Sequence, residues 1–332
     1  MRRIAVLCFA VLAVQMLFAQ VDTGTITGTV LDTQGAGVPS ASLTFVETST
    51  STTSKTQTDA SGNYASPPLK PGTYKVTAQA SGFKVQTHEA VSVRVQDRLR
   101  LDFNMAVGSV TENVLVTAET PSIQTDTSSL GEVITTTQIT QLPLNGRDYI
   151  QLATLTTGVV RTSSGTNGNS GGSSTGGLNS FVANGTRGTL NNFLLDGIDN
   201  NSNDNGGVVL RSNVDAIQEF KLQTNSYSAE FGRSGGAVVN AITKSGANNY
   251  HGDVFEFFRN SSLDARDFFE DPTQKKASFK QNQFGATFGG PIVKNKLFWF
   301  IDYQGTRIRN PQTFVSAIPT LEERVGNFSA PG

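Results

Sequence analysis

The stretch Leu99-Arg100-Leu101-Asp102-Phe103-Asn104-Met105 alternates apolar and polar residues without a break. A period of two puts every second side chain on one face of an extended strand, so this stretch predicts a strand with one buried and one solvated face. Shorter runs upstream repeat the pattern: Ile26, Gly28 and Val30; Leu43 and Phe45; Tyr74, Val76 and Ala78; Val91, Val93 and Val95. Gly-rich, Ser-rich and Pro-rich turns separate these runs, and short strands at this spacing favour a two-sheet sandwich.

Five segments of the same region carry a family resemblance. They are Gly28-Thr29-Val30-Leu31-Asp32, Gly37-Val38-Pro39-Ser40-Ala41, Thr58-Asp59-Ala60-Ser61-Gly62-Asn63-Tyr64, Leu69-Lys70-Pro71-Gly72-Thr73-Tyr74 and Ser81-Gly82-Phe83. The region resembles the carboxypeptidase regulatory-like domain, which implies a prealbumin-like β-sandwich, grouped with carbohydrate-binding-like folds, over residues 20–107. The glycines also suit turns, and the tyrosines also suit a hydrophobic core. The residues are therefore compatible both with a scaffold that binds no ligand and with a carbohydrate-binding module.

The N-terminus is typical of a secretory signal peptide. Arg2 and Arg3 form a positive region, residues 4–18 are almost all apolar, and the small residue Ala19 suits cleavage. We therefore expect residues 1–19 to be removed. A transmembrane helix is the alternative, but the apolar stretch is short for a span and no stop-transfer sequence follows.

Composition excludes several classes of protein. The 332 residues carry a formal net charge of -1 and no basic block, which argues against non-specific nucleic-acid binding. The only cysteine, Cys8, lies in the leader, so the mature chain has no disulfide and no cysteine metal ligand. No other apolar run approaches a spanning helix, so entry into a membrane would require a closed barrel.

From Ser109 onward the chain changes character. A short extended stretch covers residues 112–118, and residues 158–188 are rich in Gly, Ser, Thr and Asn. Ordered chain is expected to resume at residues 192–199. Further on, Val214, Ile217 and Phe220 have helical spacing, which predicts a helix over residues 214–221.

Three features follow one another after residue 192. They are Leu195-Asp196-Gly197, Ile217-Gln218-Glu219-Phe220-Lys221, and a Gly-rich turn that leads to Asn240-Ala241-Ile242-Thr243-Lys244. In their order and spacing they resemble the plug domain of TonB-dependent receptors. The resemblance implies an α+β plug within residues 108–248. Its motif would be Asp196, Gly197, Gly235, Gly236, Asn240, Thr243 and Lys244. The candidate TonB box would be Glu112, Asn113, Val114, Leu115, Val116, Thr117 and Ala118.

Within that family the chain is most similar to the Oar-like receptors, with the SusC-like glycan importers as relatives. It departs from the general pattern at residues 220–225, where the usual Arg-Gly-Pro is absent. This departure leaves the subgroup, and therefore the cargo, open.

Several short motifs could suggest an enzyme or a metal site. Gly168-Asn169-Ser170-Gly171-Gly172 and Gly232-Arg233-Ser234-Gly235-Gly236 fit G-x-S-x-G, but a nucleophile elbow needs a strand, a turn and a helix, followed by Asp and His. The Asn-rich loop from Asp199 lacks the Gly and Glu of a calcium loop, and His88 lacks the second His of a zinc helix. We expect no enzyme, no catalytic residue, no metal site and no cofactor.

Twelve of the 21 Phe and the only Trp lie between Tyr250 and Gly332. Two runs there alternate. In the first, Phe284, Ala286, Phe288 and Gly290 alternate with Gln283, Gly285, Thr287 and Gly289. In the second, Leu297, Trp299, Ile301 and Tyr303 share one face, and Phe298, Phe300, Asp302 and Gln304 share the other. An apolar row with aromatic ends opposite a more polar row is typical of outer-membrane strands. A hairpin over a soluble core is the alternative, and the plug upstream favours the barrel.

We therefore expect a mainly β chain in four parts: a signal peptide at 1–19, the sandwich at 20–107, the TonB-box segment and plug at 108–248, and the first strands of an incomplete transmembrane β-barrel at 249–332. A plugged receptor barrel has about 22 strands, so we expect an N-terminal fragment of a longer protein.

The resemblance implies energy-coupled uptake through a plugged barrel in the cell outer membrane, with the sandwich in the periplasm. Its expected partners are the C-terminal domain of TonB, the inner-membrane energising complex, outer-membrane lipid and an unidentified ligand (a glycan, a peptide or a chelate), but no nucleic acid. The alternative is a secreted or surface protein that uses the sandwich for carbohydrate binding or adhesion. An open reading frame that continues through several hundred residues of alternating strands would favour the transporter.

Overall fold

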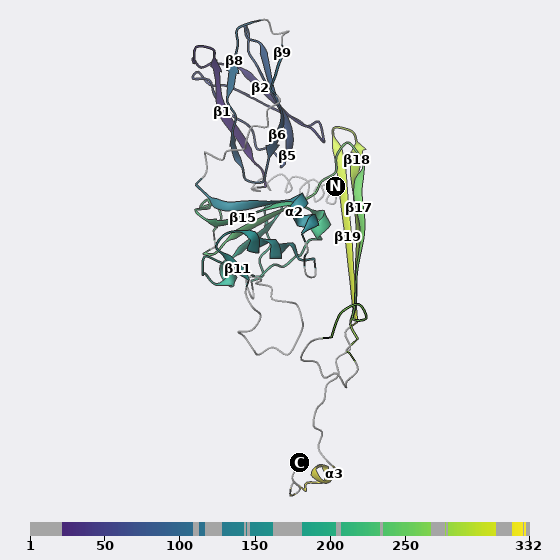
Figure 1. Cartoon of the computed structure of the whole chain (residues 1–332). Coiled ribbons are helices and arrows are strands. Elements are labelled where there is room, and N and C mark those ends of the chain that lie inside the picture. Colours follow the sequence, from purple (N-terminus) through teal and green to yellow (C-terminus); the bar gives the residue numbers. More distant parts are fainter. Residues whose placement is uncertain are drawn as a thin grey trace, which may run out of the picture. The chain divides into compact units, whose positions relative to one another are not determined.

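The computed structural model describes residues 22–108, 113–116, 128–142, 144, 147–161, 181–203, 207–232, 235–266, 276, 278–309, 321–327 and 329. The expected signal peptide lies outside these residues. The described chain is mainly β, which confirms the predicted fold class (Figure 1). Within these ranges no helix is long and apolar enough to cross a membrane.

The N-terminal domain consists of two sheets. The first has the order β4-β1-β7, and β8 also pairs with β1; the bounds are β1 (Thr25–Asp32), β4 (Asn63–Ala65), β7 (Arg98–Arg100) and β8 (Phe103–Met105). The second has the order β3-β2-β5-β6-β9; the bounds are β2 (Ser42–Glu47), β3 (Thr53–Gln57), β5 (Gly72–Gln79), β6 (Val85–Val93) and β9 (Asn113–Val116). Residues 99–105 thus form β8 and most of β7, and both strands pair in parallel with β1.

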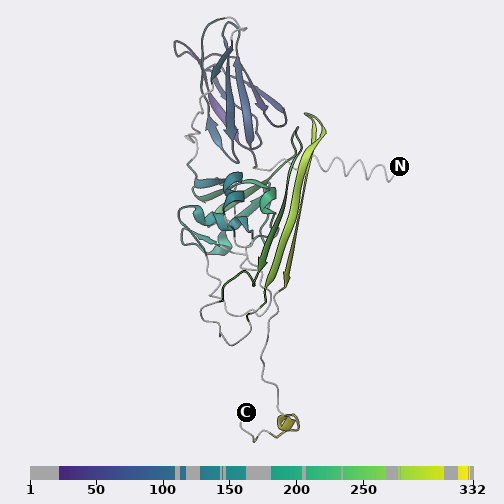
Figure 2. The same cartoon turned by 45° about the vertical axis from the view of Figure 1, so that its right-hand side comes forward.

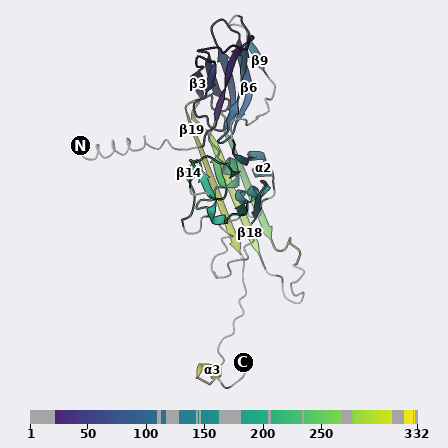
Figure 3. The same cartoon turned by 90° about the vertical axis from the view of Figure 1, so that its left-hand side faces the viewer.

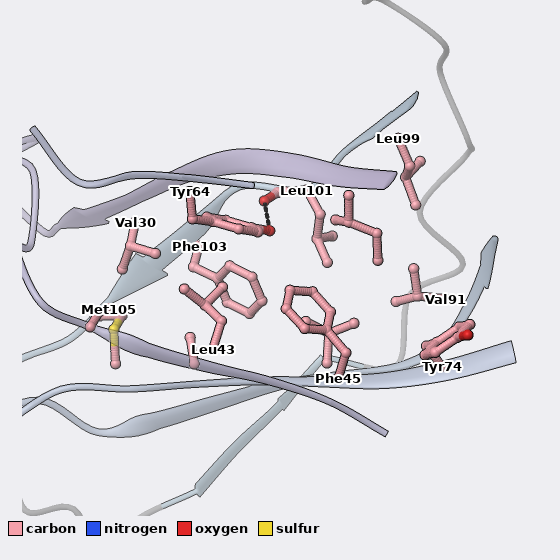
Figure 4. Close-up of a cluster of buried hydrophobic side chains, with 14 of the residues drawn as sticks. Val30, Leu43, Phe45, Tyr64, Tyr74, Val91, Leu99, Leu101, Phe103 and Met105 are labelled. Atoms are coloured by element: carbon pink, nitrogen blue, oxygen red, sulfur yellow. Dashed lines mark hydrogen bonds between the residues drawn. The ribbon is translucent and has the colours of Figure 1, made fainter. Parts of the chain in front are cut away.

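The predicted alternation produces the core between these sheets, because the apolar side chains of both sheets point inward (Figure 4). Phe103 is fully buried, and its ring centroid lies 6.2 Å from that of Tyr64. The Tyr64 hydroxyl donates to the Leu101 carbonyl oxygen at 2.6 Å, so the tyrosine enters the core without an unsatisfied polar atom. Gly28 is required in β1, since a Cβ at this position would lie 2.0 Å from the Leu101 carbonyl oxygen.

The central domain is built on a five-stranded sheet of order β10-β15-β16-β13-β14. Its bounds are β10 (Leu130–Thr135), β13 (Asn192–Leu195), β14 (Ile198–Asp199), β15 (Ile217–Asn225) and β16 (Val238–Thr243). Short helices and a two-stranded sheet accompany it: α2 (Thr136–Gln141), η2 (Tyr149–Leu155), η3 (Gly188–Leu190), η4 (Val214–Ala216), β11 (Val159–Arg161) and β12 (Phe181–Ala183). Phe220 and Leu222 of β15 are fully buried in the second hydrophobic cluster, which this domain forms by itself.

The predicted helix over residues 214–221 is wrong. Only Val214–Ala216 is helical, as the single 3-10 turn η4, and from Ile217 the chain is extended as β15. Phe220 and Leu222 are both buried and are two apart, as in a strand. β15 pairs with both β10 and β16, and the β15–β16 register shifts between Ile217 and Glu219. These two ladders of backbone hydrogen bonds outweigh a local spacing that suits either a helix or a strand.

The last sheet has the order β17-β18-β19, with bounds β17 (His251–Asn260), β18 (Lys280–Val293) and β19 (Leu297–Arg309) (Figure 2). Its burial is inverted relative to a soluble sheet. Gln283 and Thr287 are 7% and 3% exposed, whereas Phe288 and Ile301 are 46% and 61% exposed. Apolar side chains that face outward opposite buried polar ones are the pattern of membrane strands. After this sheet the chain has a four-residue helix, α3 (Leu321–Arg324).

Candidate functional site

The candidate TonB box is in part an ordered strand. Of its seven residues, Asn113–Val116 form β9, while Glu112, Thr117 and Ala118 lie outside the described residues. β9 pairs in parallel with β6 of the sandwich, with Val85 opposite Asn113 and His88 opposite Val116. The extended conformation suits recognition by strand addition, because such a segment presents its backbone groups to a partner sheet.

Part of the expected plug motif lies at one end of the central sheet, around the tight turn between β13 and β14. Asp196 and Gly197 form that turn with φ values of 51° and 76°. The Asp196 carboxylate accepts from the backbone N–H of Thr243 at 2.8 Å and from its hydroxyl at 2.9 Å. The Asp196 N–H donates to the Ala241 carbonyl oxygen at 2.8 Å. The aspartate thus fastens the β13–β14 turn to the end of β16.

The remaining motif residues are spread along β16 to the opposite end of the sheet. The backbone N–H groups of Gly235 and Gly236 both donate to the Leu190 carbonyl oxygen, at 3.2 and 3.1 Å. Asn240 is 1% exposed in β16. The Lys244 ammonium lies 3.7 Å from the Asp253 carboxylate, and its N–H donates to the Ala216 carbonyl oxygen. These contacts make the motif residues a structural frame for the sheet.

A second group of polar residues, which sequence reasoning missed, lies between the sandwich and the central sheet. Lys221 of β15 places its ammonium 3.4 Å from Asp97 Oδ1 and donates to the Gln96 carbonyl oxygen at 3.0 Å. Glu219 of β15 accepts from the Val95 N–H at 2.6 Å. We name the four residues Val95, Asp97, Glu219 and Lys221 the docking cluster.

The residues of the docking cluster are almost completely buried from solvent. The side chains of Lys221 and Asp97 are 4% and 1% exposed, and Glu219 is 8% exposed. Burial raises the pKa of Glu219 from 4.5 to about 7, and the nearby Asp97 charge acts in the same direction. Burial also lowers the pKa of Lys221, against the opposing attraction of Asp97. Both shifts have the direction expected for charges that are removed from water.

The sequence did contain a signal for this cluster. In β15, the polar Glu219, Lys221 and Gln223 alternate with the apolar Phe220 and Leu222, which is a strand pattern. The apolar residues face the core of the central domain, and the sandwich covers Glu219 and Lys221. If the central domain is considered alone, these polar residues are expected to face solvent.

The motifs that could suggest an enzyme cannot be assigned a structure here, because both Ser170 and Ser234 lie outside the described residues. In the part of the chain that the structure describes, no group of three or more His, Cys, Asp or Glu side chains is arranged to hold a metal ion.

Comparisons with known proteins match this architecture. The family model of the outer membrane beta barrel domain matches residues 242–332, and that of the carboxypeptidase regulatory-like domain matches residues 25–106. The TonB-dependent transporter Oar of Myxococcus xanthus is 30% identical over 318 residues, which cover 88% of this chain and 28% of that protein. The chain therefore spans little more than a quarter of the length of this relative.

Two solved structures are also similar to parts of the chain. The siderophore receptor PirA from Acinetobacter baumannii aligns with 64% of this chain and 28% of its own, at 24% identity and a TM-score of 0.40. The 5-hydroxyisourate hydrolase of Klebsiella pneumoniae aligns with 26% of this chain and 92% of its own, at 22% identity and a TM-score of 0.21. From its two family matches and its relationship to Oar, the chain contains a carboxypeptidase regulatory-like domain and an outer membrane beta barrel domain, and it is a homologue of a TonB-dependent transporter.

Proposed function

We propose that the chain is the periplasmic and plug-bearing part of an outer-membrane transporter that uses TonB to import a ligand. The observation that carries this proposal is the 30% identity to a TonB-dependent transporter over 88% of the chain, a span too long to rest on the sandwich alone. Under this proposal residues 1–19 direct secretion, 20–107 form a periplasmic domain, 108–248 hold the TonB box and plug, and 249–332 begin the barrel.

In this mechanism TonB captures residues 112–118 by strand addition, in which an extended segment joins the edge of a sheet. The next strand that the structure describes after this segment is β10, which lies at the edge of the central sheet and pairs only with β15 among the described strands. An edge strand can leave a sheet without breaking the other pairings. A pull on the segment would therefore detach β10 first and loosen the plug from that side.

Deletion of residues 112–118 from the full-length protein tests the assignment. The deletion should abolish pull-down by the C-terminal domain of TonB and leave folding intact, because the described members of the two hydrophobic clusters lie within residues 26–105 and 134–241. Deletion of residues 119–125 shortens the same linker by the same length and serves as the control. Undiminished TonB binding after the first deletion would show that the box lies elsewhere.

The imported ligand is the open part of the proposal. A strain that lacks the intact gene can be grown on glycans, on peptides and on iron chelates as limiting nutrients. We expect a growth defect on one of these classes that the wild-type gene restores. Equal growth on all three classes, with and without the gene, would contradict import of any of them.

A further inference from the structure

The segment that the proposed function assigns to TonB is already paired with the protein itself. β9 is the fifth strand of the second sandwich sheet, next to β6 (Figure 3). The register runs from Val85 opposite Asn113 to His88 opposite Val116. On its other side β6 pairs with β5, so both edges of β6 are occupied at Thr87.

The connection from the sandwich to β9 is short and anchored. Val107 forms an isolated bridge with Phe83, and the Gly108 N–H donates to the Gly82 carbonyl oxygen at 3.0 Å. Only four residues, 109–112, then separate this anchor from β9. A tether of this length keeps the segment at a high effective concentration beside β6, so the pairing competes well with a partner that arrives by diffusion.

A strand has two edges, and β6 takes one edge of β9. We propose that the β6 edge of the sandwich is a docking surface for this chain's own residues 113–116, and that it withholds the segment from TonB until the pairing opens. This inference rests on the proposed function, because it takes residues 112–118 as the TonB box. The pairing is built to open: it joins four residue pairs in parallel, the arrangement with the weaker pairing per residue, at the end of a sheet.

A disulfide across the two strands tests the proposal in the full-length protein. The mature sequence contains no cysteine, since Cys8 lies in the expected leader, so an introduced pair has no competitor. Thr87 lies opposite Leu115 in the register. Adjacent strands are about 4.8 Å apart, which is within the Cα separation that a disulfide spans. The double variant Thr87→Cys with Leu115→Cys would lock β9 onto β6 when oxidised.

The matched control lies in the same sheet. Thr44 of β2 lies opposite Thr77 of β5, so Thr44→Cys with Thr77→Cys adds a cross-strand disulfide that leaves β9 untouched. The isolated C-terminal domain of TonB is the probe, and its Kd is measured for each variant oxidised and reduced. The reduced form of the locking variant controls for the substitution within the segment.

We expect oxidation of the locking variant to raise the Kd for TonB by at least about tenfold, because apparent affinity scales with the fraction of free segments. Reduction should restore binding, and the control pair should bind equally in both states. Equal binding by the locked form would overturn the proposal but leave the box assignment standing. Loss of binding in the reduced and wild-type proteins as well would overturn both. If the control pair forms its disulfide but the two cysteines of the locking variant do not, β9 does not pair with β6.

Discussion

Substitution of Glu219 by glutamine should remove a pH dependence from the contact between the sandwich and the central domain. Glu219 is 8% exposed and accepts from the Val95 N–H at 2.6 Å. Glutamine has nearly the same shape and keeps an oxygen that accepts this hydrogen bond, but it cannot ionise. The substitution therefore isolates the charge of Glu219 from its packing.

The sign and size of the effect follow from the pKa of Glu219. The pKa of Glu219 is raised from 4.5 to about 7. The Glu219 carboxyl therefore holds its proton more tightly when the sandwich covers it than when it is hydrated. The stabilisation from this proton is complete below pH 4.5 and is lost as the pH rises through about 7. The difference in pKa corresponds to a loss of about 3 kcal/mol, at about 1.4 kcal/mol per pH unit. Wild type and variant should be similar at pH 5, and the variant should be more stable at pH 8.

The assay is urea unfolding of residues 20–248, followed by circular dichroism across this pH range. Both hydrophobic clusters, which span residues 26–105 and 134–241, are complete in this fragment. Glu230→Gln, at an exposed glutamate of the central domain, should leave the wild-type profile unchanged. A fragment of residues 108–248 lacks Val95 and Asp97, so in that fragment Glu219→Gln should no longer differ from wild type. Parallel profiles of wild type and Glu219→Gln in the longer fragment would show that the charge of Glu219 does not carry the pH dependence.

Three further predictions follow from the rest of the structure. Residues 22–107 expressed alone should show a cooperative thermal transition and sediment as a monomer, because their core is complete, whereas a broad, non-cooperative melt would mean that the boundary is wrong. Asp196→Ala should lower the free energy of unfolding of the central domain by about 2 kcal/mol, as two hydrogen bonds to Thr243 are lost; an equal loss in Asp196→Asn, which retains an acceptor oxygen and tolerates the positive φ, would argue against that cause. In the full-length protein Ile301→Arg should cost about 2–4 kcal/mol of folding into bilayers if Ile301 is near the midplane, and Gln304→Arg should cost much less; equal costs would contradict the assignment of faces.

The sandwich could be predicted from the sequence because each of its strands keeps one face toward the core of its own domain. Leu99, Leu101, Phe103 and Met105 are all at most 5% exposed, as their spacing requires. The family resemblance of the turns agreed with this alternation, and the matched family model covers the same region. The local alternation and the family resemblance indicate the same fold, so either of them was sufficient to predict the sandwich.

The central domain was harder because its most informative strand is covered by another domain. Glu219 and Lys221 of β15 are buried against the sandwich. The alternation in residues 219–223 indicates a strand, but it does not show which segment, more than a hundred positions away, covers these polar side chains. Val214, Ile217 and Phe220 have the spacing of a helix, but the first belongs to a 3-10 turn and the other two to a strand. Periodicity over eight residues cannot separate these cases when both faces are buried.

The pairing of β9 with β6 was beyond sequence reasoning for a different reason, and it bears on how a pull would act. The sequence identified residues 112–118 as extended, but an extended segment can pair with any open edge. The β6–β9 ladder has four register pairs in parallel, and the β10–β15 ladder has six in antiparallel. Parallel pairs are the weaker per residue, so the β6–β9 ladder should open spontaneously more often than the β10–β15 ladder. The segment would then become available to TonB before any pull disturbs the plug, and the disulfide that locks β9 should stop both steps.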